Sequence, residues 1–176
     1  MEPLRGGKLV RDLPEAVTNA FEKAEIKKSP AEWALRWVWN HPEVSVVLSG
    51  MNVMDHINEN LRIASGALPN SLTQKELEIM DTVKKAYSAR TKVNCTGCQY
   101  CMPCPVGVNI PKNFAVYNEY SLFVTPETEK ELKARYNSVE AKERADKCVE
   151  CGKCESHCPQ AIKIREELKN VTALFA

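Results

Sequence analysis

All eight cysteines of the chain lie in two short stretches, and this restricts the possible folds more than any other feature of the sequence. The first stretch, Cys95 to Pro105, reads CTGCQYCMPCP, and the second, Cys148 to Pro159, reads CVECGKCESHCP. Each contains the spacing Cys-x2-Cys-x2-Cys and ends in a Cys-Pro pair. The copies differ in their last gap, which has two residues in the first and three in the second. Each copy therefore places three thiols on one tight loop, around which the chain has to fold.

The repeated spacing predicts iron–sulfur ligation. A cubane cluster presents its iron corners close together, so one short loop can reach three of them and the fourth ligand comes from elsewhere. In two-cluster ferredoxins this ligand is the cysteine that precedes proline in the other motif. We therefore expect two 4Fe-4S clusters with crossed ligands. The expected ligands of cluster I are Cys95, Cys98, Cys101 and Cys158. Those of cluster II are Cys148, Cys151, Cys154 and Cys104.

Two other uses of cysteine compete with this interpretation. Zinc also binds Cys-x2-Cys pairs, and eight cysteines can form two tetrahedral sites. Zinc does not require the third cysteine or the Cys-Pro ending, so the pattern favours iron and sulfide. Disulfides are disfavoured because the first residues, MEPLRGGKLV, lack the apolar segment of a signal peptide. We expect a cytoplasmic protein.

Composition excludes two further classes of partner. Charged residues make up 27% of the chain and the formal net charge is +1, so no basic field points to nucleic acid. The longest mostly apolar run, Val44 to Met54, is too short to cross a bilayer. We therefore expect no nucleic-acid partner and no membrane span.

Residues 1–68 show helical and strand-like patterns in alternation. Apolar residues recur at helical spacing in 13–25, 29–42 and 53–66. Residues 44–50, VSVVLSG, are rich in β-branched valine and mostly apolar, as in a strand buried on both faces of a parallel sheet. This alternation predicts an α/β arrangement.

The second of these helical segments has a capping signal at its start. Ser29 can cap the helix, and Glu32, three residues later, can complete a capping box. Trp33 and Trp37 are four residues apart, which places them on one helix face, so we expect both in the core.

The rest of the chain is expected to be mostly helical. Thr73 and Glu76 form another capping box, which predicts an amphipathic helix over residues 74–90. The 43 residues between Cys104 and Cys148 are helical in character, more like α-helical ferredoxin modules than a small β-rich ferredoxin. Further helices are expected within residues 111–123, 125–139 and 162–175.

Residues 3–9, PLRGGKL, and residues 29–64, SPAEWALRWVWNHPEVSVVLSGMNVMDHINENLRIA, resemble the end of an aldo/keto reductase. More specifically, they resemble the subgroup that carries a C-terminal ferredoxin domain with paired cysteine motifs. The resemblance implies the last βα units of a TIM-type (β/α)8 barrel, followed by a mostly α-helical two-cluster ferredoxin domain. The expected parts are a partial barrel in 1–68, a linking amphipathic helix in 69–91 and the ferredoxin-like domain in 92–176.

The resemblance also implies positions that contact a nicotinamide cofactor, NAD(P), provided that the barrel is completed. Near the phosphates it places Pro3 and Leu4. After the last barrel strand, on the same face, it places Ser49, Gly50, Met51 and Asn52. Near the adenine it places Glu59 and Asn60. His56 stands where NADP-preferring members often have an arginine, and a neutral imidazole binds the 2′-phosphate less strongly, so a preference for NADP is not implied.

The catalytic Asp, Tyr, Lys and His of the family come from the first half of the barrel, which this chain lacks. We therefore expect that the chain does not reduce a carbonyl by itself. A remnant with two strands would leave a sheet edge and apolar surface open. We expect this surface to be covered by a barrel-completing chain, by self-association through the open edge, or by refolding onto the ferredoxin part.

Three functions remain as alternatives. The first is an electron-transfer protein that exchanges electrons with a redox partner protein. The second is the C-terminal part of an NAD(P)H-dependent carbonyl oxidoreductase that is active only with an N-terminal part. The third is a zinc-binding structural domain. We favour the first because it depends on residues that are present in the chain.

Overall fold

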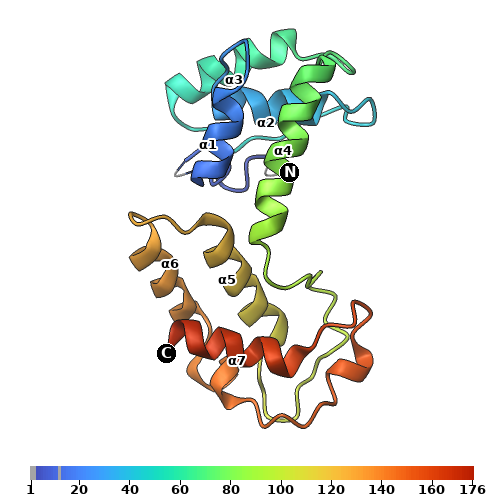
Figure 1. The fold of residues 1–176 in the computed structure, drawn as a ribbon, viewed down its shortest axis with the longest axis vertical. Coiled ribbons are helices and arrows are strands. Elements are labelled where there is room, and N and C mark those ends of the chain that lie inside the picture. Colours follow the sequence, from blue (N-terminus) through green and yellow to red (C-terminus); the bar gives the residue numbers. More distant parts are fainter. Residues whose placement is uncertain (1–2, 12) are drawn as a thin grey trace. The chain divides into compact units, whose positions relative to one another are not determined.

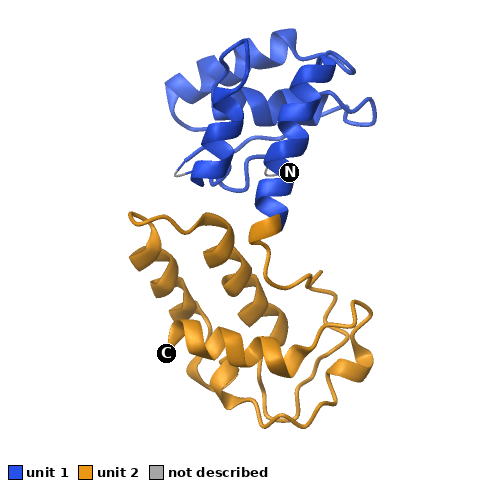
Figure 2. Ribbon diagram, in the orientation of Figure 1, with its two compact units in different colours: residues 1–88 blue, residues 89–176 orange. Residues whose placement is uncertain are grey.

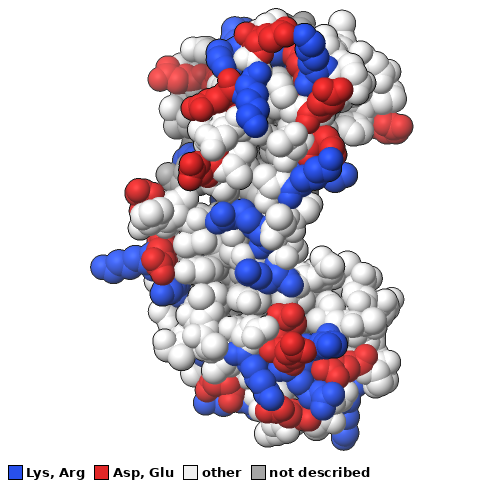
Figure 3. Space-filling view, viewed as in Figure 1, with Lys and Arg blue, Asp and Glu red and all other residues white. Residues whose placement is uncertain are grey.

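The computed structural model of the chain describes residues 3–11 and 13–176 (Figure 1). The chain divides into two compact units, residues 1–88 and residues 89–176 (Figure 2). The space-filling view shows Lys and Arg interspersed with Asp and Glu on the face of each unit that is drawn (Figure 3). Within the described ranges, no helix combines the length and apolar character that a membrane span requires.

Unit 1 is built from helices at the positions where the periodicity predicts them. They are α1 (Glu15–Glu22), α2 (Pro30–Trp39), α3 (Met54–Gly66) and α4 (Gln74–Arg90). Both caps form: Ser29 Oγ accepts a hydrogen bond from the Glu32 amide at 3.0 Å, and Thr73 Oγ1 accepts one from the Glu76 amide at 3.3 Å. At Thr73 the capping box is complete, because Glu76 accepts a hydrogen bond from the Thr73 amide at 2.8 Å.

The predicted α/β barrel remnant is wrong for the part of the chain that the structure describes, because no β-strand is present there. Residues 44–50 form a segment without regular structure, and Val46 and Leu48 are 72% and 55% exposed. Residues 3–9, part of the segment for which the resemblance implied the last βα units, form turns. The physical reason is that a strand exists only through hydrogen bonds to a neighbouring strand. The open sheet edge on which the expected self-association rested is absent from the described residues as well.

The core of unit 1 contains only one of the two tryptophans that were predicted for it. Trp33 is fully buried, and its ring stacks on Phe21 with 5.7 Å between the centroids. Trp37 is 38% exposed, so its prediction as a core residue is wrong. Its ring makes an edge contact with His41, which lies just after the end of α2.

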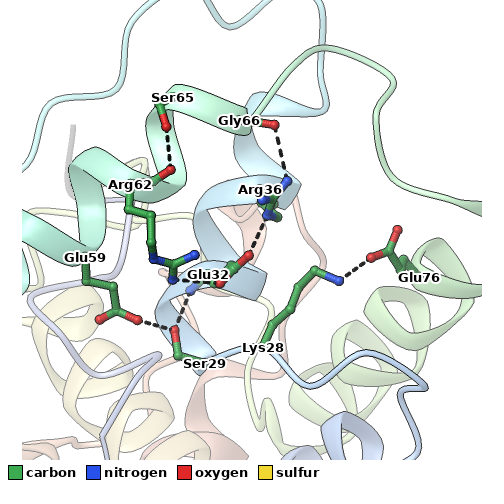
Figure 4. A network of polar contacts seen from close by, with 9 residues as sticks. All are labelled: Lys28, Ser29, Glu32, Arg36, Glu59, Arg62, Ser65, Gly66 and Glu76. Carbon is green, nitrogen blue, oxygen red and sulfur yellow. Dashed lines mark hydrogen bonds and ion pairs between the residues drawn. The ribbon is translucent and has the colours of Figure 1, made fainter.

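A charged network joins α2 to α3 and the loops beside them (Figure 4). The Glu32 carboxylate accepts hydrogen bonds from Arg36 at 2.8 Å and from Arg62 at 3.0 Å. Burial opposes ionisation of Glu32, but the hydrogen bonds and charges of the two arginines outweigh it, so the pKa of Glu32 lies below its ordinary value. Glu32 is thus a buried carboxylate that stays charged and links two helices. In the same network, Lys28 pairs with Glu76.

Unit 2 contains longer helices at the predicted places and short 3₁₀ turns between them. The α-helices are α5 (Ile110–Phe123), α6 (Glu129–Arg135) and α7 (Ile164–Phe175). The 3₁₀ helices are η1 (Tyr136–Ser138), η2 (Ala141–Glu143), η3 (Ala145–Lys147) and η4 (Glu155–His157). α5 and α7 pack together and enclose a core that includes Phe114, Ile164 and Leu168, each no more than 1% exposed. The cysteine loops lie against this core.

Candidate metal centre

The eight cysteines of unit 2 are divided between two cavities. Cavity I is lined by Cys95, Cys98, Cys101 and Cys158. Cavity II is lined by Cys104, Cys148, Cys151 and Cys154. Each set takes three cysteines from one motif and the last cysteine from the other, which is the grouping that crossed ligands require. That these thiols ligate metal stays a prediction.

The donor set of each cavity is four cysteines. A tetrahedral zinc ion needs its sulfur ligands about 2.3 Å from a single centre. Within the described residues, no group of three or more His, Cys, Asp or Glu side chains is arranged to hold a metal ion. Each set of four includes three cysteines of one Cys-x2-Cys-x2-Cys motif and the Cys-Pro cysteine of the other, which zinc does not require, so the donor set fits an iron–sulfur cluster better than zinc.

The cysteine loops repeat the same backbone conformation, which explains how each curls around its cavity. In the first loop Gly97 and Gln99 have φ values of 70° and 65°, and the matching residues of the second, Glu150 and Gly152, have 55° and 76°. Such left-handed residues among turns direct successive backbone N–H groups into a concavity that favours negative charge, as at many iron–sulfur sites. In the second loop the Glu150 amide already donates a hydrogen bond to Cys148 Sγ at 3.4 Å.

The repeat continues after the last cysteine of each motif. Three residues beyond it stand Gly107 and Ala161, with φ values of 81° and 51°. The amide of each donates a hydrogen bond to the carbonyl of that last cysteine, at 3.0 and 3.1 Å. Six residues beyond the last cysteine stand Ile110 and Ile164, which begin α5 and α7. The structure therefore contains two copies of one loop–helix unit, each of which contributes to both cavities.

The unequal last gap of the two motifs is accommodated locally. In the first copy the gap contains a cis peptide bond between Met102 and Pro103. In the second copy the additional residue is taken up by η4. The turn that leads into the gap is equivalent in the two copies, since the amides of Met102 and Glu155 donate hydrogen bonds to the carbonyls of Gln99 and Gly152 at 2.9 and 3.1 Å. The difference therefore does not disturb the grouping of the thiols.

Two asparagines of α5 hold the segments that lead into the cysteine loops. Asn118 accepts hydrogen bonds from the amides of Lys92 and Val93 at 3.1 and 3.0 Å, and it donates one to the Val93 carbonyl at 2.7 Å. Asn113, which is fully buried, accepts one from the Ala145 amide at 2.9 Å. The segment that contains Val93 leads to Cys95 of cavity I, and the segment that contains Ala145 leads to Cys148 of cavity II. The sequence reading did not identify either asparagine, because their partners are distant in sequence.

Burial makes two of the thiols weak acids. It raises the pKa of Cys101 and that of Cys154, the latter to about 11, and the neighbouring carboxylate of Glu155 adds to the effect on Cys154. A metal ligand has to be a thiolate, so binding at these positions displaces a proton. The positive charge of iron, when bound in the cavity, would supply the interaction that drives this loss.

The positions implied for a nicotinamide cofactor lie in unit 1, where they do not line a common cavity as the cysteines do among the cavities described above. Asn60 Nδ2 donates to Met51 Sδ at 3.1 Å, and the Ser29 hydroxyl donates to the Glu59 carboxylate at 2.6 Å. Pro3 and Leu4 lie in the turns near the start of the chain. Ser49, Gly50, Asn52 and His56 are exposed. Binding of NAD(P) at these positions stays a prediction.

Comparison with known proteins agrees with this division of the chain. Residues 9–85 match the aldo/keto reductase family, and residues 94–162 match the family described as the 4Fe-4S dicluster domain. No curated protein and no solved structure matches the chain significantly. The chain therefore joins a segment of the aldo/keto reductase family to a 4Fe-4S dicluster domain, which confirms the resemblance predicted from its motifs.

Proposed function

We propose that the chain is an electron-transfer protein that holds two 4Fe-4S clusters, one in each cavity. The observation that supports this most strongly is the division of the eight cysteines into two sets of four, each set lining its own cavity. Cys95, Cys98, Cys101 and Cys158 would hold the first cluster. Cys104, Cys148, Cys151 and Cys154 would hold the second. Each cluster supplies a site that accepts and releases single electrons at a potential set by its surroundings.

The arrangement of the cavities supports transfer between the two clusters. Ile110 lines both cavities, so groups held in them lie on either side of one side chain. Cys98 and Cys151, one in each set, are exposed, so both cavities approach the surface. We propose that a redox partner protein exchanges electrons with the chain there. Eight free thiols are compatible with the reducing cytoplasm, which is the proposed location.

Metal and sulfide analysis tests this function directly. After anaerobic reconstitution with iron and sulfide, the protein should contain about eight iron and eight sulfide per chain, the content of two cubanes. It should be brown and lose this colour on reduction. Uptake of zinc in place of iron, with no acid-labile sulfide, would leave the zinc-binding structural domain as the better explanation.

A second candidate function is supported by the match of residues 9–85 to the aldo/keto reductases. Here the chain is the C-terminal part of an NAD(P)H-dependent carbonyl oxidoreductase, and a barrel-completing chain covers the exposed residues Val46 and Leu48. Mixing the chain with an N-terminal aldo/keto reductase half should then give a stable complex that oxidises NAD(P)H when a carbonyl compound is added. Absence of complex formation would remove this candidate and leave electron transfer untouched.

A further inference from the structure

The two cavities are built alike, but they differ in charge at one equivalent position. Pro111 is the second residue of α5 and Arg165 is the second residue of α7, each seven residues after the last cysteine of its motif. Pro111 lines cavity I and Arg165 lines cavity II. The repeated loop–helix unit therefore puts a neutral ring beside one cavity and a guanidinium beside the other.

Arg165 is held in this place by contacts on two sides. Its amide donates a hydrogen bond to one oxygen of Glu155 at 2.9 Å, and its guanidinium donates to the other at 2.8 Å. The guanidinium also lies over Gly152, where a Cβ would be 3.5 Å from Arg165 Cζ. Gly152 stands between two of the cysteines of cavity II. The positive charge is therefore fixed against the loop that forms this cavity.

Arg165 is also the one charged residue among the described residues that line either cavity. Glu155 partly offsets its charge, but Glu155 does not line the cavity. Lys169 and Glu150 form a further pair on the same helix and loop, at 2.7 Å, and neither of them lines the cavity. The side chain of Arg165 is 46% exposed, so water screens part of its field.

We propose that Arg165 makes the cluster of cavity II easier to reduce than the cluster of cavity I. This inference rests on the proposed function. Reduction adds a negative charge to a cluster, and a fixed positive charge at the cavity wall stabilises that form more than the oxidised one. Arg165 is the one charge at either cavity wall within the described residues, so its field favours reduction of the cluster of cavity II, against the opposing field of Glu155 beside Cys154. Unpaired electrons in a partly reduced protein reside mainly on the cluster of cavity II.

The reconstituted protein allows a direct test by anaerobic redox titration, followed by visible absorbance and electron paramagnetic resonance. The wild-type chain should show two one-electron steps. In Arg165→Gln the equilibrium constant for reduction at the upper step should fall by a factor of about three to ten. For a one-electron couple this lowers the potential by about 30–60 mV. The lower step should not move. Arg165→Lys keeps the positive charge, so the potential of its upper step should stay close to the wild-type value.

A matched control separates the effect of position from the effect of net charge. Lys169→Gln removes one positive charge from the same helix at a residue that does not line cavity II, and its shift should be less than half as large. Cys151→Ala identifies the steps, because it should remove the upper step and leave the lower one. Equal movement of both steps in Arg165→Gln, or loss of the lower step in Cys151→Ala, would overturn the inference while the clusters remain. A chain that takes up no iron would instead reject the proposed function.

Discussion

The Tyr136 hydroxyl donates a hydrogen bond to Asn113 Oδ1 at 3.0 Å, in the interior of unit 2. The same oxygen accepts the Ala145 amide, while Asn113 Nδ2 donates to the carbonyls of Asn109 and Glu143 at 2.8 and 2.9 Å. One amide side chain thus joins α5 to η1 and to the segment before Cys148. Every polar atom of this buried group has a partner, so the network stabilises one conformation of that segment.

Replacing Asn113 by Ala should destabilise unit 2 by about 3 kcal/mol, because several buried polar groups lose their partner together. Tyr136→Phe should cost less, about 1 kcal/mol, since it removes only the hydroxyl. Denaturant unfolding of the reconstituted protein, followed by the visible absorbance of the clusters, measures both. Asn170→Ala, at an exposed position of α7, is the control. Equal stability of the Asn113 and Asn170 variants would contradict a structural role for the network.

The parts of the fold that depend on neighbouring residues could be predicted from the sequence. The caps at Ser29 and Thr73, the helices of both units and the placing of three cysteines on each loop follow from spacing within short segments. The fourth cysteine of each set is distant in sequence, and it was expected from the ligand pattern of two-cluster ferredoxins. A cluster loop in particular brings its ligands together within a few residues, so its sequence pattern carries most of the geometry.

The parts that depend on distant residues could not be predicted. Residues 44–50 have the composition of a buried strand, but a strand needs a partner strand, and the described chain provides none. The partners of Asn113 and the position of Arg165 beside cavity II are set by the packing of α5 against α7. Only the comparison of CPVGVNIPKNF with CPQAIKIREEL, aligned on the last cysteine of each motif, could have indicated that Pro111 and Arg165 are equivalent.

Cys104→Ala should remove the cluster of cavity II and leave that of cavity I, although Cys104 belongs to the first motif. Iron should fall to about four per chain, the content of one cubane. Cys101→Ala should give the same iron content by removing the cluster of cavity I. The two variants differ in the cluster that remains, which is that of cavity I in Cys104→Ala and that of cavity II in Cys101→Ala. Adding Arg165→Gln should shift the remaining potential in Cys101→Ala and not in Cys104→Ala. Loss of the cluster of cavity I in Cys104→Ala would contradict crossed ligands.

Gln99→Gly should stabilise the loop of cavity I. Gln99 has a φ of 65°, a conformation that costs a residue with a Cβ about 1 kcal/mol and costs glycine little. The matching residue of the second loop, Gly152, shows that glycine is suited to this position. Gln99→Val should have the opposite effect, because a β-branched residue is least tolerant of positive φ. Thermal loss of cluster absorbance measures both variants, and the same change at Thr96, Thr96→Val, is the control. Lower thermal stability of Gln99→Gly would reject this explanation.

Glu32→Gln should destabilise unit 1 by about 2 kcal/mol at neutral pH, because the hydrogen bonds from Arg36 and Arg62 lose their charged acceptor. The pKa of Glu32 is lowered in the folded chain, so its contribution is complete above the ordinary value of 4.5 and is lost as the pH falls through the lower folded value. The difference in the free energy of unfolding between wild type and variant should therefore shrink at acid pH.

All three tryptophans lie in residues 1–88, so tryptophan fluorescence during denaturant unfolding follows unit 1. Glu25→Gln, which affects an exposed pair with Lys75, should change stability by less than about 0.5 kcal/mol. If the free energy of unfolding of Glu32→Gln stays below that of the wild type by the same amount down to acid pH, the variant is destabilised by altered packing and not by loss of the charge.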